Sequence, residues 1–211
     1  MRAAWLALAF LLLPAARASA EWQIKPFFAA TFGGGTTLAP FVVEQVGEVK
    51  RTFGVSGVFV GEIVGIEGDV ALTPGFFQTG KGHLPFSPGE VTLNGSSVAT
   101  ITGNVVIAAP RRLTEYTLRP YFVGGAGVMR ARTEPTESQA YLLSSNWAAF
   151  DIGGGAAGFL SDRYGVSWDV RYFHSLRGKT GSTGLGVGAP EQLSFWRVNM
   201  AFVVRLRHKT R

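Results

Sequence analysis

Hydrophobic and polar residues alternate along the last part of the chain. In residues 195–207, FWRVNMAFVVRLR, every second position from Trp196 to Leu206 is apolar. The positions between them hold the polar residues Arg197, Asn199, Arg205 and Arg207. Because successive side chains of a β-strand point to opposite faces, this segment is predicted to be a strand with one apolar and one polar face.

The same period of two recurs upstream, whereas helical periodicity is hard to find. Most of the predicted strands are about ten residues long, the length that a tilted strand needs to cross a bilayer. The eight predicted strands are residues 22–32, 51–60, 66–73, 98–107, 117–130, 147–159, 166–173 and 195–207.

The gaps between these strands alternate in length. The long gaps are residues 33–50, 78–97, 131–146 and 174–192, and the short ones are 61–64, 108–116 and 160–165. Short turns on one side and long loops on the other are typical of outer-membrane barrels, with both termini on the short-turn, periplasmic side. The sequence therefore predicts an all-β fold, an eight-stranded antiparallel transmembrane up-and-down β-barrel.

The first twenty residues resemble an export signal. Arg2 is followed by an apolar stretch from Trp5 to Leu13, which is too short to span a bilayer as a helix, and Ala18-Ser-Ala20 fits a cleavage site. We therefore expect residues 1–20 to be a cleaved signal peptide and residues 21–211 to form the barrel domain.

The amino-acid composition excludes several kinds of site and partner. The 211 residues include no cysteine, which excludes disulfides and thiolate metal sites, and only 16% are charged. The net charge of +6 has one cluster, the basic end from Arg205 to Arg211. We interpret that cluster as a solvated tail and expect no nucleic-acid partner. The isolated His83 and His208 predict no metal site, and no cofactor is expected.

Several segments together resemble one family. The chain is similar to the small OmpA/OmpX-type eight-stranded barrels of bacterial outer membranes, a resemblance that covers residues 21–211. It implies location in the outer membrane, contact with lipid and lipopolysaccharide, and insertion by the barrel assembly machinery. Because a closed barrel has no unpaired edge, we expect a monomer. The segments that carry the resemblance are VGIEGDVALTPGFF (64–77), LRPYFVGGAGVMR (118–130), FDIGGGAAGFLSDRYGVSWDVRYF (150–173) and the last strand.

Charged residues in the strands are expected to face the lumen, because an Arg or Lys facing mid-membrane hydrocarbon costs roughly 2–4 kcal/mol. We interpret these residues as a structural ion-pair network, with a narrow, gated ion path as the alternative. Glu67 and Asp69 share a face, as a glycosidase pair would, but an eight-stranded lumen is filled by side chains and leaves no room for a sugar. The predicted lumenal residues are Glu67, Asp69, Asp151, Asp169, Arg171, Arg197 and Arg205.

Two motifs invite an enzymatic reading. Gly153-x-Gly155-x-x-Gly158 has the spacing of a dinucleotide fingerprint, but a turn follows it where a helix would be needed, so we interpret its glycines as small residues of a strand. His174-Ser175 suggests comparison with lipid A deacylases, yet adjacent strand residues face opposite ways. We expect no enzymatic activity.

Aromatic residues fall near the ends of the predicted strands, where they would anchor the barrel at the membrane interfaces. These are Trp22, Phe32, Phe76, Phe77, Trp147 and Trp196. The leading functional hypothesis is a non-enzymatic outer-membrane barrel with a structural, adhesive or protective role carried by its loops. A narrow channel is the alternative, followed by a lipid A-modifying enzyme and a secreted, lipocalin-like barrel.

Overall fold

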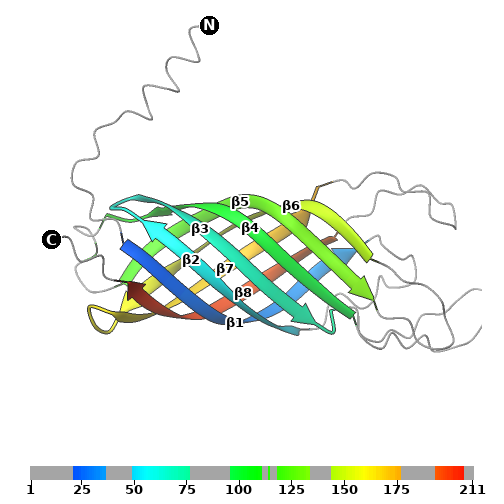
Figure 1. Cartoon of the computed structure of the whole chain (residues 1–211), viewed down its shortest axis with the longest axis horizontal. Coiled ribbons are helices and arrows are strands. Elements are labelled where there is room, and N and C mark those ends of the chain that lie inside the picture. The colour runs from blue at the N-terminus through cyan, green and yellow to red at the C-terminus, as the bar shows by residue number, and fades with distance from the viewer. Residues whose placement is uncertain are drawn as a thin grey trace, which may run out of the picture.

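Eight antiparallel strands make up almost all of the structure (Figure 1). The computed structural model describes residues 21–36, 49–76, 96–110, 114, 118–133, 144–176 and 193–206. Each strand covers its predicted range to within a few residues, and no helix that could cross a membrane occurs in these segments. The strands are β1 (Glu21–Thr36), β2 (Lys50–Val60), β3 (Val64–Pro74), β4 (Ser96–Ala108), β5 (Leu118–Thr133), β6 (Ser144–Phe159), β7 (Tyr164–Ser175) and β8 (Leu193–Leu206).

The sheet closes on itself in sequence order, so the predicted up-and-down barrel is confirmed. Closure is made by β1 and β8, whose pairing begins at Trp22 and Leu206 and shifts register between Phe32 and Gly35. Gly33 lies in that shift with a φ of 60°, a conformation that glycine adopts without strain. None of the eight strands has a free edge.

The two ends of the barrel differ in the length of the connections between strands. Residues 61–63, 109–117 and 160–163 join strands at one end, called here the turn side, and the four longer connections leave the other end, the loop side. The third turn is shorter than the predicted 160–165, because Tyr164 and Gly165 already pair with β8. The Leu160 and Ser161 amides close this turn by donating to the Tyr164 carbonyl.

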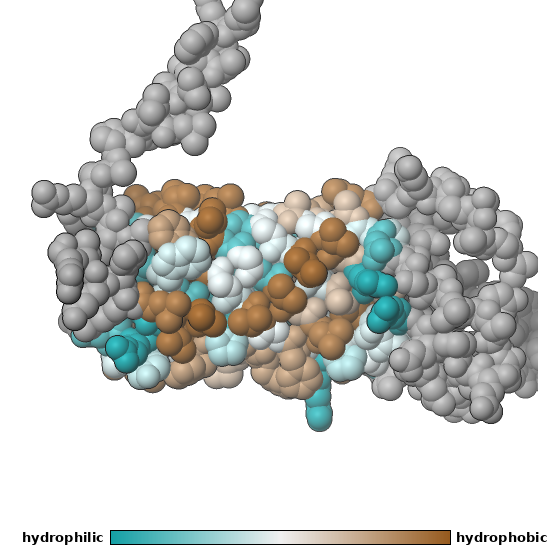
Figure 2. All heavy atoms as spheres, viewed as in Figure 1, coloured by the Kyte–Doolittle hydropathy of each residue, from teal (hydrophilic) through white to brown (hydrophobic). Residues whose placement is uncertain are grey.

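The outward face of the barrel is apolar. Phe122, Met200 and Ile66 are 74%, 68% and 61% exposed, and hydrophobic side chains lie along much of the visible wall between the two ends in Figure 2. Polar and charged side chains alternate with them and point inward. A soluble, lipocalin-type barrel would have the opposite arrangement, so that alternative does not fit this fold.

Aromatic rings form two bands on the outward face. On the turn side, Trp22 lies 5.0 Å from Phe59, and Tyr164 stacks on Phe202. On the loop side, Trp196 lies 5.0 Å from Tyr172. Such bands are typical of the membrane interfaces of a transmembrane barrel.

Two of the expected interface aromatics face the lumen instead. Trp147 shares the inward positions of β6 with Asp151 and is buried. Phe76 follows Gly75, whose φ of 66° breaks the strand alternation and lets the ring cover the end of the lumen. The expectation for these two residues was therefore wrong, and Phe77 lies outside the described residues.

Inside the barrel, three layers follow one another from end to end. The loop-side plug is a cluster of buried apolar residues, the central charged layer follows, and the turn-side cluster closes the other end. The loop-side plug consists of Phe76, Val98, Met129, Ala131, Trp147, Ala149, Phe173, Leu193 and Phe195. The turn-side cluster consists of Val58, Val60, Val106, Ala108, Tyr121, Val123 and Ala157.

Candidate functional site

The central charged layer contains six of the seven predicted lumenal residues. All six occupy odd-numbered positions of β3, β6, β7 and β8, which point into the barrel, and all are buried. They are Glu67, Asp69, Asp151, Asp169, Arg171 and Arg197.

Arg171 lies at the centre of this layer. Its Nη1 is 2.5 Å from Glu67 Oε1, and its Nε donates to Asp169 Oδ1 at 2.8 Å. The carboxylates of Asp69 and Asp151 stand 3.9 and 3.8 Å from the same Nη1. One guanidinium therefore faces acids from three strands, and it compensates charges that would otherwise be buried alone.

Arg197 forms the second part of the layer, on the side of the loop-side plug. Its Nη2 donates to Asp69 Oδ1 at 2.8 Å, and its guanidinium lies 4.5 Å from the ring centre of Phe173 and 4.9 Å from that of Phe27. Ser56 donates a further hydrogen bond to Asp69. The aromatic faces thus cover a cation that water does not reach.

Asp169 is held by several donors at once. Beside Arg171, the Tyr121 hydroxyl donates to its Oδ2 at 2.7 Å and the Asn199 amide to its Oδ1 at 2.6 Å. Asp151 differs sharply, because neither of its buried oxygens has a hydrogen-bond partner among the described residues. The carboxylates of Asp169 and Asp151 both lie in the lumen, but only that of Asp169 accepts hydrogen bonds from its described neighbours.

Arg205, predicted to share this network, lies apart from it at the turn-side mouth. Its Nε is 3.2 Å from Glu21 Oε1, and its guanidinium stacks on Phe159 with 3.2 Å to the ring centre. The interpretation of one continuous network is therefore corrected at this position. The reason is its place near the end of β8, beyond the turn-side cluster.

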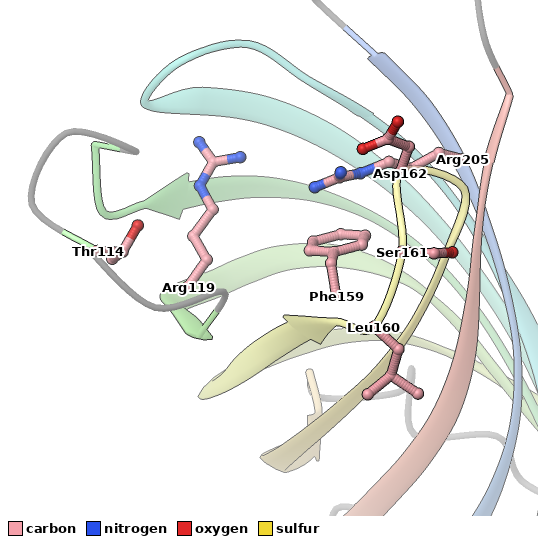
Figure 3. A pocket seen from close by; sticks show the side chains of 7 residues that line it. All are labelled: Thr114, Arg119, Phe159, Leu160, Ser161, Asp162 and Arg205. Atoms are coloured by element: carbon pink, nitrogen blue, oxygen red, sulfur yellow. The ribbon is translucent and has the colours of Figure 1, made fainter.

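A cavity of about 370 Å³ opens at the same mouth (Figure 3). Figure 3 shows the guanidinium groups of Arg119 and Arg205 extending into the space above Phe159. Arg119 donates to the carbonyls of Gly61, Glu62 and Ala109, so it ties the β2–β3 turn to the end of β4. The cavity is lined by Thr114, Arg119, Phe159, Leu160, Ser161, Asp162 and Arg205.

The glycines of the fingerprint-like motif have a packing role. A Cβ on Gly153 would collide with the Val170 carbonyl and with Arg171, and one on Gly155 would collide with Asp169. Both glycines lie in the middle of β6 and face the lumen, so the missing side chains leave room for the ion pair on β7. The nucleotide interpretation does not fit, because the motif lies within β6 and a turn, not a helix, follows it.

His174 and Ser175 lie on opposite faces of β7. The His174 ring is on the outward side, stacked on Tyr172, whereas Ser175 is buried and accepts a hydrogen bond from the Leu193 amide at 2.7 Å. The two side chains therefore do not form a hydrolytic pair. Within the described residues, no group of three or more His, Asp or Glu side chains could hold a metal ion.

Several lumenal polar residues were not predicted. Lys25 is buried and lies 4.9 Å from the ring centre of Tyr121, and Asn104 donates to Glu67. The alternation in WQIKPFF puts Lys25 on the face opposite Trp22 and Ile24, so the signal for Lys25 was present in the sequence. Tyr121 carried no such signal, because a tyrosine fits either face of a transmembrane strand.

Comparisons with known proteins identify the fold only. No family model and no curated protein sequence matches the chain. Among solved structures, Neisserial surface protein A (NspA) aligns over 88% of this chain and 97% of its own, with a TM-score of 0.60 and 9% identity. The outer membrane protein OprG of Pseudomonas aeruginosa aligns over 90% and 98%, with a TM-score of 0.54 and 13% identity.

A third similar structure is that of outer membrane protein AlkL in lipid bilayers. It aligns over 92% of this chain and 93% of its own, with a TM-score of 0.51 and 14% identity. All three cover nearly the whole barrel at low identity, so the likeness concerns the backbone and carries no residue from one site to another.

Proposed function

Because the chain has the fold of the small eight-stranded outer-membrane barrels, we propose that it is a non-enzymatic membrane anchor whose lumen is closed. It lies in the bacterial outer membrane with its turn side toward the periplasm and its loop side outward. The anchor holds the four long connections at the cell surface, where they serve a structural, adhesive or protective role.

The filled lumen is the observation that carries this proposal. The loop-side plug, the central charged layer and the turn-side cluster succeed one another along the lumen. An ion crossing the barrel would have to pass Phe173 and Phe195, stacked with ring centres 5.1 Å apart, and then separate Arg171 from Glu67. Both steps are costly in a low-dielectric interior.

Conductance of the pure protein in planar bilayers tests the closed lumen. We expect no steady openings from the native chain. We expect openings from a variant in which the two stacked rings are removed, Phe173→Ala with Phe195→Ala, combined with Arg171→Ala. Phe122→Ala is the matched control for lost aromatic volume, because Phe122 faces outward.

Steady openings of the native chain that are lost or altered on substituting Arg171 would overturn the closed lumen and favour the alternative, a narrow ion channel. Asp151 Oδ1 and Asn199 Oδ1 are buried without a hydrogen-bond partner among the described residues, and a hydrated path through the lumen would satisfy them.

Absence of enzymatic activity is the second part of the proposal. His174 and Ser175 face opposite ways, and the lumenal carboxylates are enclosed by packed side chains. Lipid A from cells that overexpress the chain should therefore have an unchanged mass spectrum. A loss or gain of acyl groups would contradict this part of the proposal without affecting the closed lumen.

Membrane location has its own test. Fractionation should recover the chain with the outer membrane, and a closed barrel should migrate differently in gels before and after heating. A soluble protein without that heat-induced shift would contradict the anchor itself.

A further inference from the structure

Two arginines interrupt the apolar outward face of β5 at its loop-side end. Arg130 and Arg132 occupy even-numbered positions of this strand and are exposed, as are the apolar outward residues Phe122 and Val128 before them. Within the described part of the chain, neither guanidinium has a hydrogen-bond or ion-pair partner. Two adjacent cations thus point away from the barrel wall rather than into the lumen.

Their depth along the strand fits the membrane surface. At about 3.3 Å per residue and a tilt of roughly 40°, the stretch from Leu118 to Val128 spans about 25 Å, the height of the apolar band of a transmembrane barrel. Arg130 and Arg132 come directly after this stretch. They therefore lie at the level of the lipid headgroups of the loop-side leaflet.

The outward charges of the strands are unevenly distributed. Arg51, near the start of β2, is also exposed and also lies on the loop side. In the described strands, no Asp or Glu occupies an outward-facing position. The turn side has charges of both signs, in Glu62, Asp162 and Arg163. Among the described strand residues, the outward-facing charges on the loop side are therefore all cationic.

The ladder neighbours of the arginine pair are small or polar residues. Arg130 pairs across the ladder with Ala99 and Asn146, and Arg132 with Ser97. These neighbours are small or able to donate a hydrogen bond. Elsewhere on the loop side, the outward positions of β7 and β8 hold the bulky rings of Tyr172 and Trp196.

We propose that Arg130 and Arg132 bind the phosphate groups of lipid A, the phosphorylated glycolipid in the outer leaflet of a bacterial outer membrane. Two guanidinium forks side by side suit a phosphate ester, which each can bind with two hydrogen bonds. Arg51 contributes to the attraction from a separate place on the rim. This proposal rests on the proposed membrane orientation and names the lipid that the loop-side rim binds.

Native mass spectrometry of the full chain in detergent micelles, titrated with bisphosphorylated lipid A, tests the proposal. We expect saturable binding that weakens at least about tenfold in the double variant Arg130→Gln with Arg132→Gln. Lipid A stripped of both phosphates should bind the native chain as weakly. The double lysine variant, which keeps both charges but loses the fork, should fall between the two.

Arg163→Gln is the matched control, since it removes an exposed arginine from the turn side. Equal binding by the native chain and the double glutamine variant would overturn the proposal, as would equal binding of phosphorylated and stripped lipid. Binding of a soluble sulfated glycan in place of lipid A at this pair would also overturn it. If the native chain conducts ions and the double glutamine variant binds lipid A more weakly, only the proposal of a closed lumen is refuted.

Discussion

Arg171 on β7 and Glu67 on β3 meet across the lumen, with 2.5 Å between Nη1 and Oε1, although 104 positions separate them in the chain. Three strands intervene between β3 and β7 in either direction around the barrel. The ion pair therefore joins opposite walls, and it depends on the closed sheet rather than on any local segment.

Replacing Arg171 by methionine should destabilise the barrel by about 3–5 kcal/mol, because Glu67 and Asp169 would remain buried without their cation. The free energy of unfolding by urea in lipid vesicles measures this effect. Arg163→Met, on the exposed turn, should change it by less than about 0.5 kcal/mol. An equally small effect of the Arg171 variant would show that the network does not stabilise the fold.

The two lumenal aspartates of β6 and β7 should respond differently to the same change. Asp169→Asn removes the ion pair at 2.8 Å and weakens two further hydrogen bonds, so it should cost about 3–5 kcal/mol of unfolding free energy. Asp151→Asn removes only a 3.8 Å ion pair from a carboxylate without hydrogen bonds, and should cost less than about 1 kcal/mol or stabilise. The same urea titration compares them, and equal losses would contradict their unequal support.

Alanine in place of Gly153 should destabilise by roughly 1–3 kcal/mol, because its Cβ would collide with the Val170 carbonyl and with Arg171. Gly68→Ala, on the outward face of β3, is the matched substitution, since a Cβ there meets nothing within 4 Å. It should be neutral or slightly stabilising. Unfolding midpoints of the two variants would separate the packing effect from a general intolerance of alanine for glycine.

Arg119→Gln should weaken the turn-side mouth, because the carbonyls of Gly61, Glu62 and Ala109 would lose a charged donor. We expect a loss of about 1–3 kcal/mol. Hydrogen exchange should rise at the amides of Gly61 and Ala108, which close this region. Faster exchange at the loop-side amide of Gly75 as well would indicate global rather than local loosening.

The strands and their faces could be predicted because the alternation of apolar and polar residues can be recognised within each short segment of sequence. Glu67, Asp69 and Arg171 each alternate with apolar or glycine neighbours, which a lipid-facing wall would place outward. The same alternation links Trp147 to Asp151 and indicates that both face the lumen. Its aromatic type and its position near a strand end instead indicate the membrane interface, and the structure follows the alternation.

The partners of each charge could not be predicted in the same way. Arg197 binds Asp69, 128 positions earlier, and this choice depends on the tilt and stagger that closure imposes on all eight strands. Phe76 was unpredictable for another reason. A single left-handed residue, Gly75, reverses the parity after the strand, and sequence does not reveal where such a break occurs.

The pairing of β1 with β8 also limits when the barrel can close during folding. Glu21 opens β1 and Leu206 ends β8, so the barrel cannot close until the last strand is present. Until then the hydrogen-bonding groups of β1 that later face β8 have no partner strand. The first seven strands, with an unpaired edge and apolar faces, are therefore prone to aggregate until β8 pairs with β1.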